Sequence, residues 1–368
     1  RRHHSRAHRR RAGRQDRLML RRAGPDKLSA FATAVLQSAG ADAASSEAAS
    51  WAMIHASLHG VDSHGIRLLP WYADCLRTGV AKGNPQVRVE LRRRAAALVD
   101  ADDGLGHIAM YRAMDEACAL ARDCGIGMAS VINSTHFGAA GAYTLAAAQA
   151  GFIGLVASNS GAFVVPHDGM KPIHGTSPLS FSAPNPGGEP FFLDMATSSI
   201  PWNKVLRFRT EGLELPPGVA VDAAGAFVTD PHKAVALAPV GGPDFGYKGA
   251  ALAGMTEVLG AMLTGMRLSA EQDGLALADT KVGHFVMAID PTLFMPIESF
   301  ATRVDSYIGN FRAQPGTYAA GGPEWELARG PQRRRGDRER EQHGIPLPDG
   351  LFAELQSAGE KAGIQLNI

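Results

Sequence analysis

The sequence predicts an α/β protein, and three observations support this fold class. Short apolar runs with strand character alternate with amphipathic helical segments over the central part of the chain. The chain has 368 residues, more than a single core normally serves, so we expect two lobes. Hydrophobic residues make up 45% of the chain and charged residues 20%, as in ordinary globular proteins.

The N-terminal third begins with three predicted helices. Residues 26–38 follow Pro25, and residues 45–58 open with serine and glutamate side chains that can cap a first helical turn. A third helix is predicted over 66–77 and ends before Gly79. Together with the C-terminal part of the chain, these helices are expected to form a helical lobe.

Strands and helices alternate after this point. The predicted elements are strand 95–99, helix 108–123, strand 127–132, helix 139–150 and strand 152–157. Residues 159–205 are rich in glycine, proline, serine and threonine around short strands at 179–182 and 191–193, and long loops in a compact body are usually functional. The last predicted elements are helix 250–264, strand 284–289, helix 297–311 and helix 350–362.

The charge is unevenly distributed along the chain. Residues 1–22 contain ten arginines and one aspartate, which a nucleic-acid arm or a targeting peptide would also show. We interpret residues 1–24 as a disordered or non-native leader, because the segment has no apolar face. A second basic stretch, from Arg333 through Arg340, alternates with acidic residues and is expected to be a solvated surface. Nucleic-acid binding is therefore not expected.

Cysteine use and hydropathy indicate a cytoplasmic protein without membrane spans. Cys75, Cys118 and Cys124 are odd in number and lack metal-ligand spacing, so neither a disulfide framework nor a zinc site is expected. Polar residues interrupt the longest apolar stretch before it reaches the length of a bilayer span.

Two histidines stand at junctions between predicted elements. His64 lies in Gly60-Val61-Asp62-Ser63-His64-Gly65 after an apolar helix, and His136 lies in Asn133-Ser134-Thr135-His136-Phe137-Gly138 after a strand. Histidine exchanges a proton near neutral pH, and glycine allows close approach of a substrate. We expect the two histidines to contribute to one site.

Two other patterns and one absent motif bear on the kind of site. The stretch Gly104-Leu105-Gly106 opens a helix like a dinucleotide fingerprint, but no acidic residue ends the next strand, so a turn into the helix is the preferred interpretation. His55 and His59 share a helix face without a supporting carboxylate or cysteine, so no metal site is expected. The Gly-x-Ser-x-Gly motif of serine hydrolases is absent from the sequence.

Five blocks in order resemble the malate/L-lactate dehydrogenase family of nicotinamide-dependent oxidoreductases. The blocks are Asp62-Ser63-His64-Gly65, Thr135-His136-Phe137-Gly138, Gly175-Thr176-Ser177-Pro178, Leu193-Asp194-Met195-Ala196-Thr197-Ser198 and Tyr247-Lys248-Gly249. The resemblance runs from Leu28 to the C-terminus. It implies a mixed, largely antiparallel sheet flanked by helices, without a Rossmann fold, in a homodimer. It also implies a helical substrate lobe (25–125 and 296–368) and an NAD(P)-binding lobe (126–295).

The resemblance also implies roles for individual residues. His64 matches the general acid, with Ser63 beside it, and His136 matches a residue that contacts the cofactor or carries the proton in some members. The predicted cofactor contacts are His136, Phe137, Gly138, Ser160, Asp194, Met195, Ala196, Tyr247 and Lys248. Thr176 matches a substrate contact, Lys204 is placed at the catalytic site, and Arg67 stands one residue before the family's substrate-binding arginine.

Some positions depart from the family pattern. Ser177 replaces an asparagine that is usual in the family, and the loop 241–249 is expected to be longer than the family's loop. Ala250-Ala251 stands where an aromatic residue and a glycine are common. The departures concern the predicted cofactor site more than the fold.

The predicted function is NAD- or NADP-dependent interconversion of a small 2-hydroxy acid and its 2-oxo acid. The 2-hydroxy acid would be of the malate, lactate or ureidoglycolate type. His64 would donate the proton in reduction, and Arg67 or Lys204 would pair with the substrate carboxylate. The alternatives are a catalytically impaired relative that acts as a binding protein and a reductase of cyclic imino acids.

Overall fold

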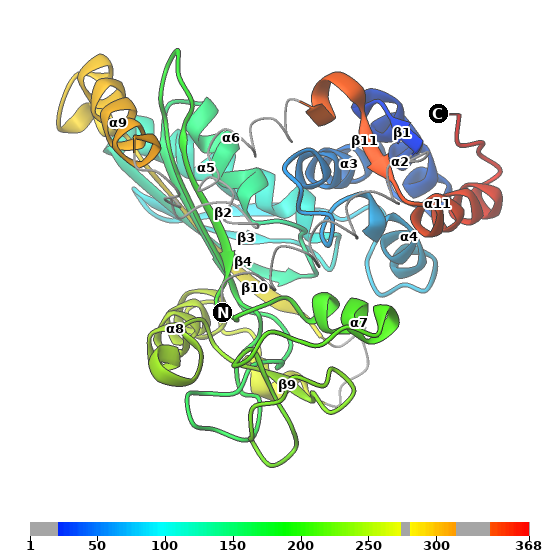
Figure 1. The fold of residues 1–368 in the computed structure, drawn as a ribbon. Helices are drawn as coiled ribbons and strands as arrows, with labels where there is room; N and C mark the ends of the chain where they lie inside the picture. Colours follow the sequence, from blue (N-terminus) through cyan, green and yellow to red (C-terminus); the bar gives the residue numbers. More distant parts are fainter. Residues whose placement is uncertain (1–20, 274–279, 314–338, 368) are drawn as a thin grey trace.

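A computed structural model describes residues 21–273, 280–313 and 339–367 (Figure 1). Residues 1–20 of the predicted leader and the basic patch Arg333–Arg335 lie outside the described residues. None of the described helices is long and apolar enough to cross a bilayer.

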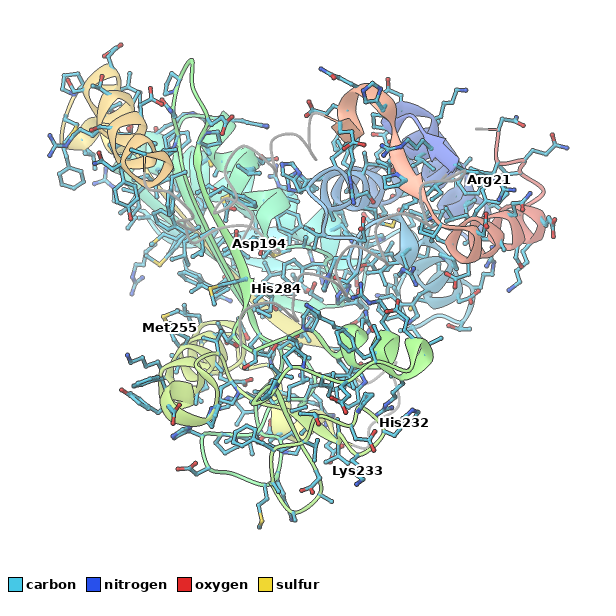
Figure 2. The ribbon with its side chains drawn as sticks, in the orientation of Figure 1. Arg21, Asp194, His232, Lys233, Met255 and His284 are labelled. Atoms are coloured by element: carbon cyan, nitrogen blue, oxygen red, sulfur yellow. The ribbon has the colours of Figure 1, made fainter. Side chains whose placement is uncertain are left out.

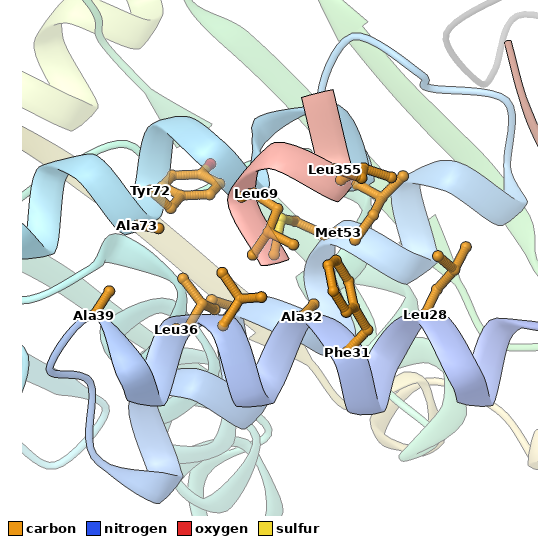
Figure 3. Close-up of a cluster of buried hydrophobic side chains, with 14 of the residues drawn as sticks. Leu28, Phe31, Ala32, Leu36, Ala39, Met53, Leu69, Tyr72, Ala73 and Leu355 are labelled. Atoms are coloured by element: carbon orange, nitrogen blue, oxygen red, sulfur yellow. The ribbon is translucent and has the colours of Figure 1, made fainter. Parts of the chain in front are cut away.

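Elements from both ends of the chain form one helical lobe. They are β1 (Arg21–Ala23), α2 (Pro25–Ser38), α3 (Ala43–Leu58), α4 (Leu69–Arg77), β11 (Ile345–Leu347) and α11 (Asp349–Ala362). A short antiparallel ladder between β1 and β11 joins the two ends. Side chains of α2, α3, α4 and α11 meet in an apolar core (Figure 3), which includes Leu28, Leu36, Met53, Leu69 and Leu355, all fully buried. Burial of this cluster holds α11 against the N-terminal helices.

A seven-stranded sheet forms the centre of the molecule, in the order β2-β3-β4-β10-β5-β6-β7. The strands are β2 (Arg88–Arg93), β3 (Ala96–Asp100), β4 (Ile126–Ser134), β5 (Ile153–Ser158), β6 (Pro178–Ala183), β7 (Phe191–Ala196) and β10 (Val282–Ile289). Only β3 and β4 pair in parallel within this sheet, and every other neighbouring pair is antiparallel. The prediction of a mixed, largely antiparallel sheet flanked by helices is confirmed.

Two helices pack closely on this sheet. They are α5 (Gly106–Cys124), which contacts β4 and β10, and α6 (Gly141–Gln149), which contacts β5 and β6. A Cβ atom at Gly127 would lie 2.1 Å from the Ala117 carbonyl oxygen, so the α5 backbone approaches β4 too closely for any larger residue there. The alanines that recur at every fourth position along α5 are fully buried, and their small side chains permit this approach.

The remaining elements lie around the two ends of the sheet. They are α7 (Trp202–Glu211), β8 (Ala220–Val221), β9 (Ala236–Leu237), α8 (Gly242–Glu257) with a π-helical turn at Val258–Met262, and α9 (Ile297–Arg312). In Figure 1, α9 lies far from α2 and α11. It adjoins the β6–β7 hairpin, where Asn185 donates to the Asp305 carboxylate at 2.7 Å.

Several sequence-based expectations need correction. The stretch 159–205 was expected to form loops around two strands, but α7 begins inside it, and the expected loop 241–249 is the first half of α8. The strands β1, β2 and β11 were not predicted, and β1 lies within the segment 1–24 that was expected to be disordered; its pairing with β11 orders residues 21–23. The expected boundary between lobes at residue 125 separates β3 from β4, which pair within one sheet, and α9 contacts the β7 side of the molecule. The rest of the lobe division stays a prediction.

Candidate active site

A cavity of about 530 Å³ lies between α4 and the ends of β4, β5 and β7. Ten residues predicted for the site line it: Ser63, His64, His136, Phe137, Gly138, Ser160, Thr176, Asp194, Met195 and Ala196. Figure 2 places Asp194 and His284 near the middle of the molecule, whereas His232 and Lys233 lie at the far edge of the α7 region. The structure therefore brings together five sequence segments that are distant along the chain.

The turn after α3 fixes the position of His64. The Ser57 hydroxyl accepts the Ile66 backbone N–H at 2.9 Å, and a Cβ atom at Gly65 would lie 2.2 Å from that hydroxyl oxygen. Gly65 is thus required for the close turn. The His64 Nδ1 atom lies 2.9 Å from the Ser63 hydroxyl. Burial lowers the pKa of His64 to about 4, so its imidazole is neutral at pH 7.

His136 follows the end of β4 and faces His64. The two ring centroids are 5.6 Å apart and the planes are inclined by 19°. The Tyr72 hydroxyl lies 2.6 Å from His136 Nδ1, and the Gly138 backbone N–H donates to the same nitrogen at 3.4 Å. Because Nδ1 accepts from these groups, the proton of the neutral ring is assigned to Nε2. Burial first, and then the neighbouring histidines, lower the pKa of His136 well below its ordinary value.

Two buried histidines lie behind this pair. His284 of β10 bridges two hydroxyls, with Nδ1 2.7 Å from Ser158 and Nε2 2.8 Å from Ser134. His107 of α5 packs edge-on against Tyr72 at 4.7 Å, and its ring nitrogens have no hydrogen-bond partner among the described residues. Burial lowers the pKa of both rings to about 3. The imidazole rings of His64, His136, His107 and His284 are thus uncharged at neutral pH.

Sequence reasoning did not single out Tyr72, His107 or His284 as site residues. Tyr72 was part of a predicted helix, His107 directly follows the Gly104-Leu105-Gly106 stretch, and His284 was the first residue of a predicted strand. The polar residue at the start of an otherwise apolar strand was the available signal for His284.

The predicted cofactor contacts Asp194, Met195 and Ala196 lie at the end of β7, which contacts α6. The Asp194 carboxylate accepts the Gly141 backbone N–H at 3.1 Å, and a Cβ atom at Gly141 would lie 2.5 Å from the Phe192 ring. The Ser160 hydroxyl lines the cavity, is buried and has no hydrogen-bond partner among the described residues. A buried hydroxyl without a partner is costly, so it fits a polar group of a bound nicotinamide dinucleotide.

Four predicted site residues do not line the cavity. Arg67 and Lys204 are exposed, and Tyr247 and Lys248 lie on α8, where the Lys248 ammonium stands 5.8 Å from the Tyr247 ring centroid. The predicted roles of these residues stay predictions.

The two alternative patterns have structural explanations. A Cβ atom at Gly106 would lie 2.3 Å from the Thr135 carbonyl oxygen, so this glycine permits close packing of α5 against the end of β4. Asp102, beside the glycines, pairs with Lys82 at 2.6 Å. The rings of His55 and His59 stack at 4.1 Å. Within the described ranges, no group of three or more His, Cys, Asp or Glu could hold a metal ion.

The sheet is largely antiparallel, so the protein does not have a Rossmann fold, which is built on a mostly parallel sheet. The malate/L-lactate dehydrogenase family model matches residues 24–356, so the chain belongs to that family. The malate dehydrogenase of Pyrococcus horikoshii is 32% identical over 348 residues, which cover 92% of this chain and 95% of the relative.

Two further relatives are named with their cofactors. The (2R)-3-sulfolactate dehydrogenase (NADP(+)) of Chromohalobacter salexigens is 31% identical over 89% of this chain and 95% of its own. The ureidoglycolate dehydrogenase (NAD(+)) of Escherichia coli K12 is 33% identical over 67% and 71%. Among solved structures, malate dehydrogenase from Entamoeba histolytica superposes with a TM-score of 0.86 at 26% identity, covering 95% of this chain and 100% of that one.

Proposed function

We propose that the protein is an NAD- or NADP-dependent dehydrogenase that interconverts a 2-hydroxy acid and its 2-oxo acid, with His64 as the proton-transferring residue. The observation that carries the proposal is the stacked pair of His64 and His136 on one cavity, 5.6 Å apart, beside the Asp194–Ala196 edge. The names of the relatives, which are malate, sulfolactate and ureidoglycolate dehydrogenases, support the same reaction class.

His64 is in the neutral form that a general base requires. Its pKa of about 4 leaves the ring neutral at pH 7, and its Nδ1 lies beside the Ser63 hydroxyl, so Nε2 is the nitrogen available to substrate. In oxidation, His64 accepts the proton of the substrate hydroxyl. When bound, the oxidised cofactor would accept the hydride, which is the hydrogen of the broken C2–H bond with both bonding electrons. In reduction, protonated His64 returns the proton to the developing alkoxide oxygen.

His136 complements His64 in this proposal. Tyr72 and Gly138 direct hydrogen bonds to Nδ1, so His136 presents Nε2–H as a donor. A neutral donor aimed into the cavity would stabilise negative charge on the substrate oxygen during hydride transfer. Tyr72 acts through His136 and is a positioning residue.

The backbone and side chains along the β7 edge would hold the dinucleotide. Ser160 offers its unpartnered hydroxyl, and the Gly141 backbone N–H fixes the Asp194 carboxylate. The absence of a side chain at Gly141 leaves room for Phe192 and Asp194. Binding here would place the cofactor against the same cavity that His64 and His136 line.

The test measures oxidation of 2-hydroxy acids by purified protein with NAD⁺ and with NADP⁺. His64→Asn should lower kcat by at least ~10², the lower range for loss of a general acid or base. Quenching of intrinsic tryptophan fluorescence by NADH or NADPH should be retained in this variant, because the proposal assigns position 64 to proton transfer and not to cofactor binding. His232→Asn, at an exposed position, is the matched control.

His136→Asn distinguishes the two histidines. Loss of the acid limb of the kcat/KM profile is expected only for the variant that lacks the true base. Near wild-type turnover of His64→Asn would reject the assignment. Absence of turnover with every 2-hydroxy acid, despite cofactor binding, would reject the proposed function.

A further inference from the structure

The described residues that line the cavity include acidic side chains but no lysine or arginine. Among the described residues that line it, the ionisable side chains besides histidine, tyrosine and cysteine are the carboxylates of Asp194 and Asp273. No lysine or arginine is among these lining residues. The sequence between Asp273 and Thr280 also contains no basic residue. An anionic substrate therefore meets carboxylates but no permanent cation on the described walls.

The basic residues nearest the cavity already have partners. The Lys281 ammonium lies behind the wall, where it donates to the Val80 carbonyl oxygen at 3.1 Å, and its charge is paired with Asp103 at 3.3 Å. Arg340 pairs with Asp62 at 2.7 Å, and Arg67 is exposed outside the lining.

The histidine pair can supply one positive charge. Both rings are neutral at pH 7 in the absence of substrate, but a carboxylate bound beside one of them would favour its protonated form, and this imidazolium would meet that single carboxylate. With the centroids 5.6 Å apart, a first positive charge opposes a second, and the neighbouring His64 already lowers the pKa of His136. The cavity thus has the means to neutralise one negative charge but not two.

The wall beyond the histidines is apolar. Trp71 and Cys75 lie one helical turn apart on α4, and Val80 and Leu105 continue the same lining. These side chains belong to or pack against the apolar core of the helical lobe, and the Trp71 ring meets His136 edge-on at 5.5 Å. A substrate side chain placed here would lose its water without gaining a polar partner, which favours hydrocarbon and disfavours charge.

We propose that the substrate is a monoanionic 2-hydroxy or 2-oxo acid with an uncharged, apolar side chain, which contacts the wall formed by Trp71, Cys75, Val80 and Leu105. Dianions such as malate, oxaloacetate or a sulfonated acid are poor substrates. This inference rests on the proposed function and narrows its substrate class relative to the malate and sulfolactate dehydrogenases to which the chain is similar.

The first experiment compares two 2-oxo acids of matched shape. In 4-methyl-2-oxopentanoate, a branched isopropyl group replaces the terminal carboxylate of oxaloacetate. Measured at pH 7 with saturating NADH or NADPH, kcat/KM should favour 4-methyl-2-oxopentanoate by roughly 100-fold or more, because the second carboxylate would be buried without a partner. Equal or better use of oxaloacetate would overturn the inference. Failure of both, and of every other 2-oxo acid, would instead overturn the proposed function.

Variants test the wall directly. Val80→Lys should improve kcat/KM for oxaloacetate relative to 4-methyl-2-oxopentanoate by about tenfold or more, since one wall cation would pair with the second carboxylate. Val80→Met, of similar length without charge, should leave the ratio unchanged. Lys281→Met should also leave it unchanged. Loss of oxaloacetate turnover on Lys281→Met, or no response to Val80→Lys in a variant that still binds NADH, would count against the proposal.

Discussion

Replacing His107 with leucine should make the fold less sensitive to acid. His107 and His284 are completely buried, and burial lowers the pKa of each from 6.5 to about 3. Because the pKa in the folded state lies below the unfolded value, each ring stabilises the fold above pH 6.5. This contribution is lost as the pH falls from 6.5 toward 3.

The magnitude follows from the two pKa values. At pH 5, the unfolded chain gains a proton on a histidine of pKa 6.5 while the folded ring of pKa about 3 stays neutral. The difference of 1.5 pH units corresponds to about 2 kcal/mol of stability lost per ring. Wild-type protein should therefore lose about 4 kcal/mol through His107 and His284 together, and His107→Leu about half of that.

The assay is urea unfolding followed by tryptophan fluorescence at pH 7.5, 6.0 and 5.0. At pH 7.5 the variant should be at least as stable as wild type, because the two unpartnered ring nitrogens of His107 are removed. Other titrating groups act equally in both proteins and cancel in the comparison. The control His232→Leu, at an exposed position, should keep the wild-type loss. Equal acid sensitivity of His107→Leu and wild type would refute the reasoning.

Three further outcomes are expected. Tyr72→Phe removes the hydroxyl 2.6 Å from His136 Nδ1, so kcat should fall by roughly tenfold, with KM for NADH unchanged in steady-state assays. Gly141→Ala places a methyl group 2.5 Å from the Phe192 ring, so stability in urea should fall by about 1–3 kcal/mol, and NADH should bind more weakly in fluorescence titrations. Met53→Ala empties a fully buried position in the helical lobe and should cost about 2–5 kcal/mol in the same unfolding assay.

Apolar periodicity was sufficient to predict the main helices and the central strands. The elements that were not predicted either bury little apolar surface or pair with a strand that is far away in the sequence. The residues of β2 are mainly exposed and rich in arginine. In α7 only Val205 is buried, and the neighbouring sequence is rich in proline and glycine. β1 and β11 have three residues each and become strands only through their mutual pairing. Local pattern carries no information about such distant partners.

The candidate site was predictable where residue type and junction position coincided. His64 and His136 were expected to meet, and they share the cavity. Tyr72 was not predicted as a site residue because His136, the partner of its hydroxyl, lies 64 residues away in the sequence. A tyrosine in an amphipathic helix is expected to pack in the hydrophobic core. The direction of Arg67 and Lys204 could not be inferred either, because long cations on short helices reach solvent as readily as a cavity.

The position of β10 also affects how the chain can fold during synthesis. β10 occupies the slot between β4 and β5, although more than a hundred residues of chain separate it from either strand. Until residue 289 leaves the ribosome, each of those earlier strands exposes a row of unpaired backbone groups on the side that β10 will fill. Nascent chains halted before this point would offer two open edges to other polypeptides, which makes premature termination or stalling here a route to aggregation.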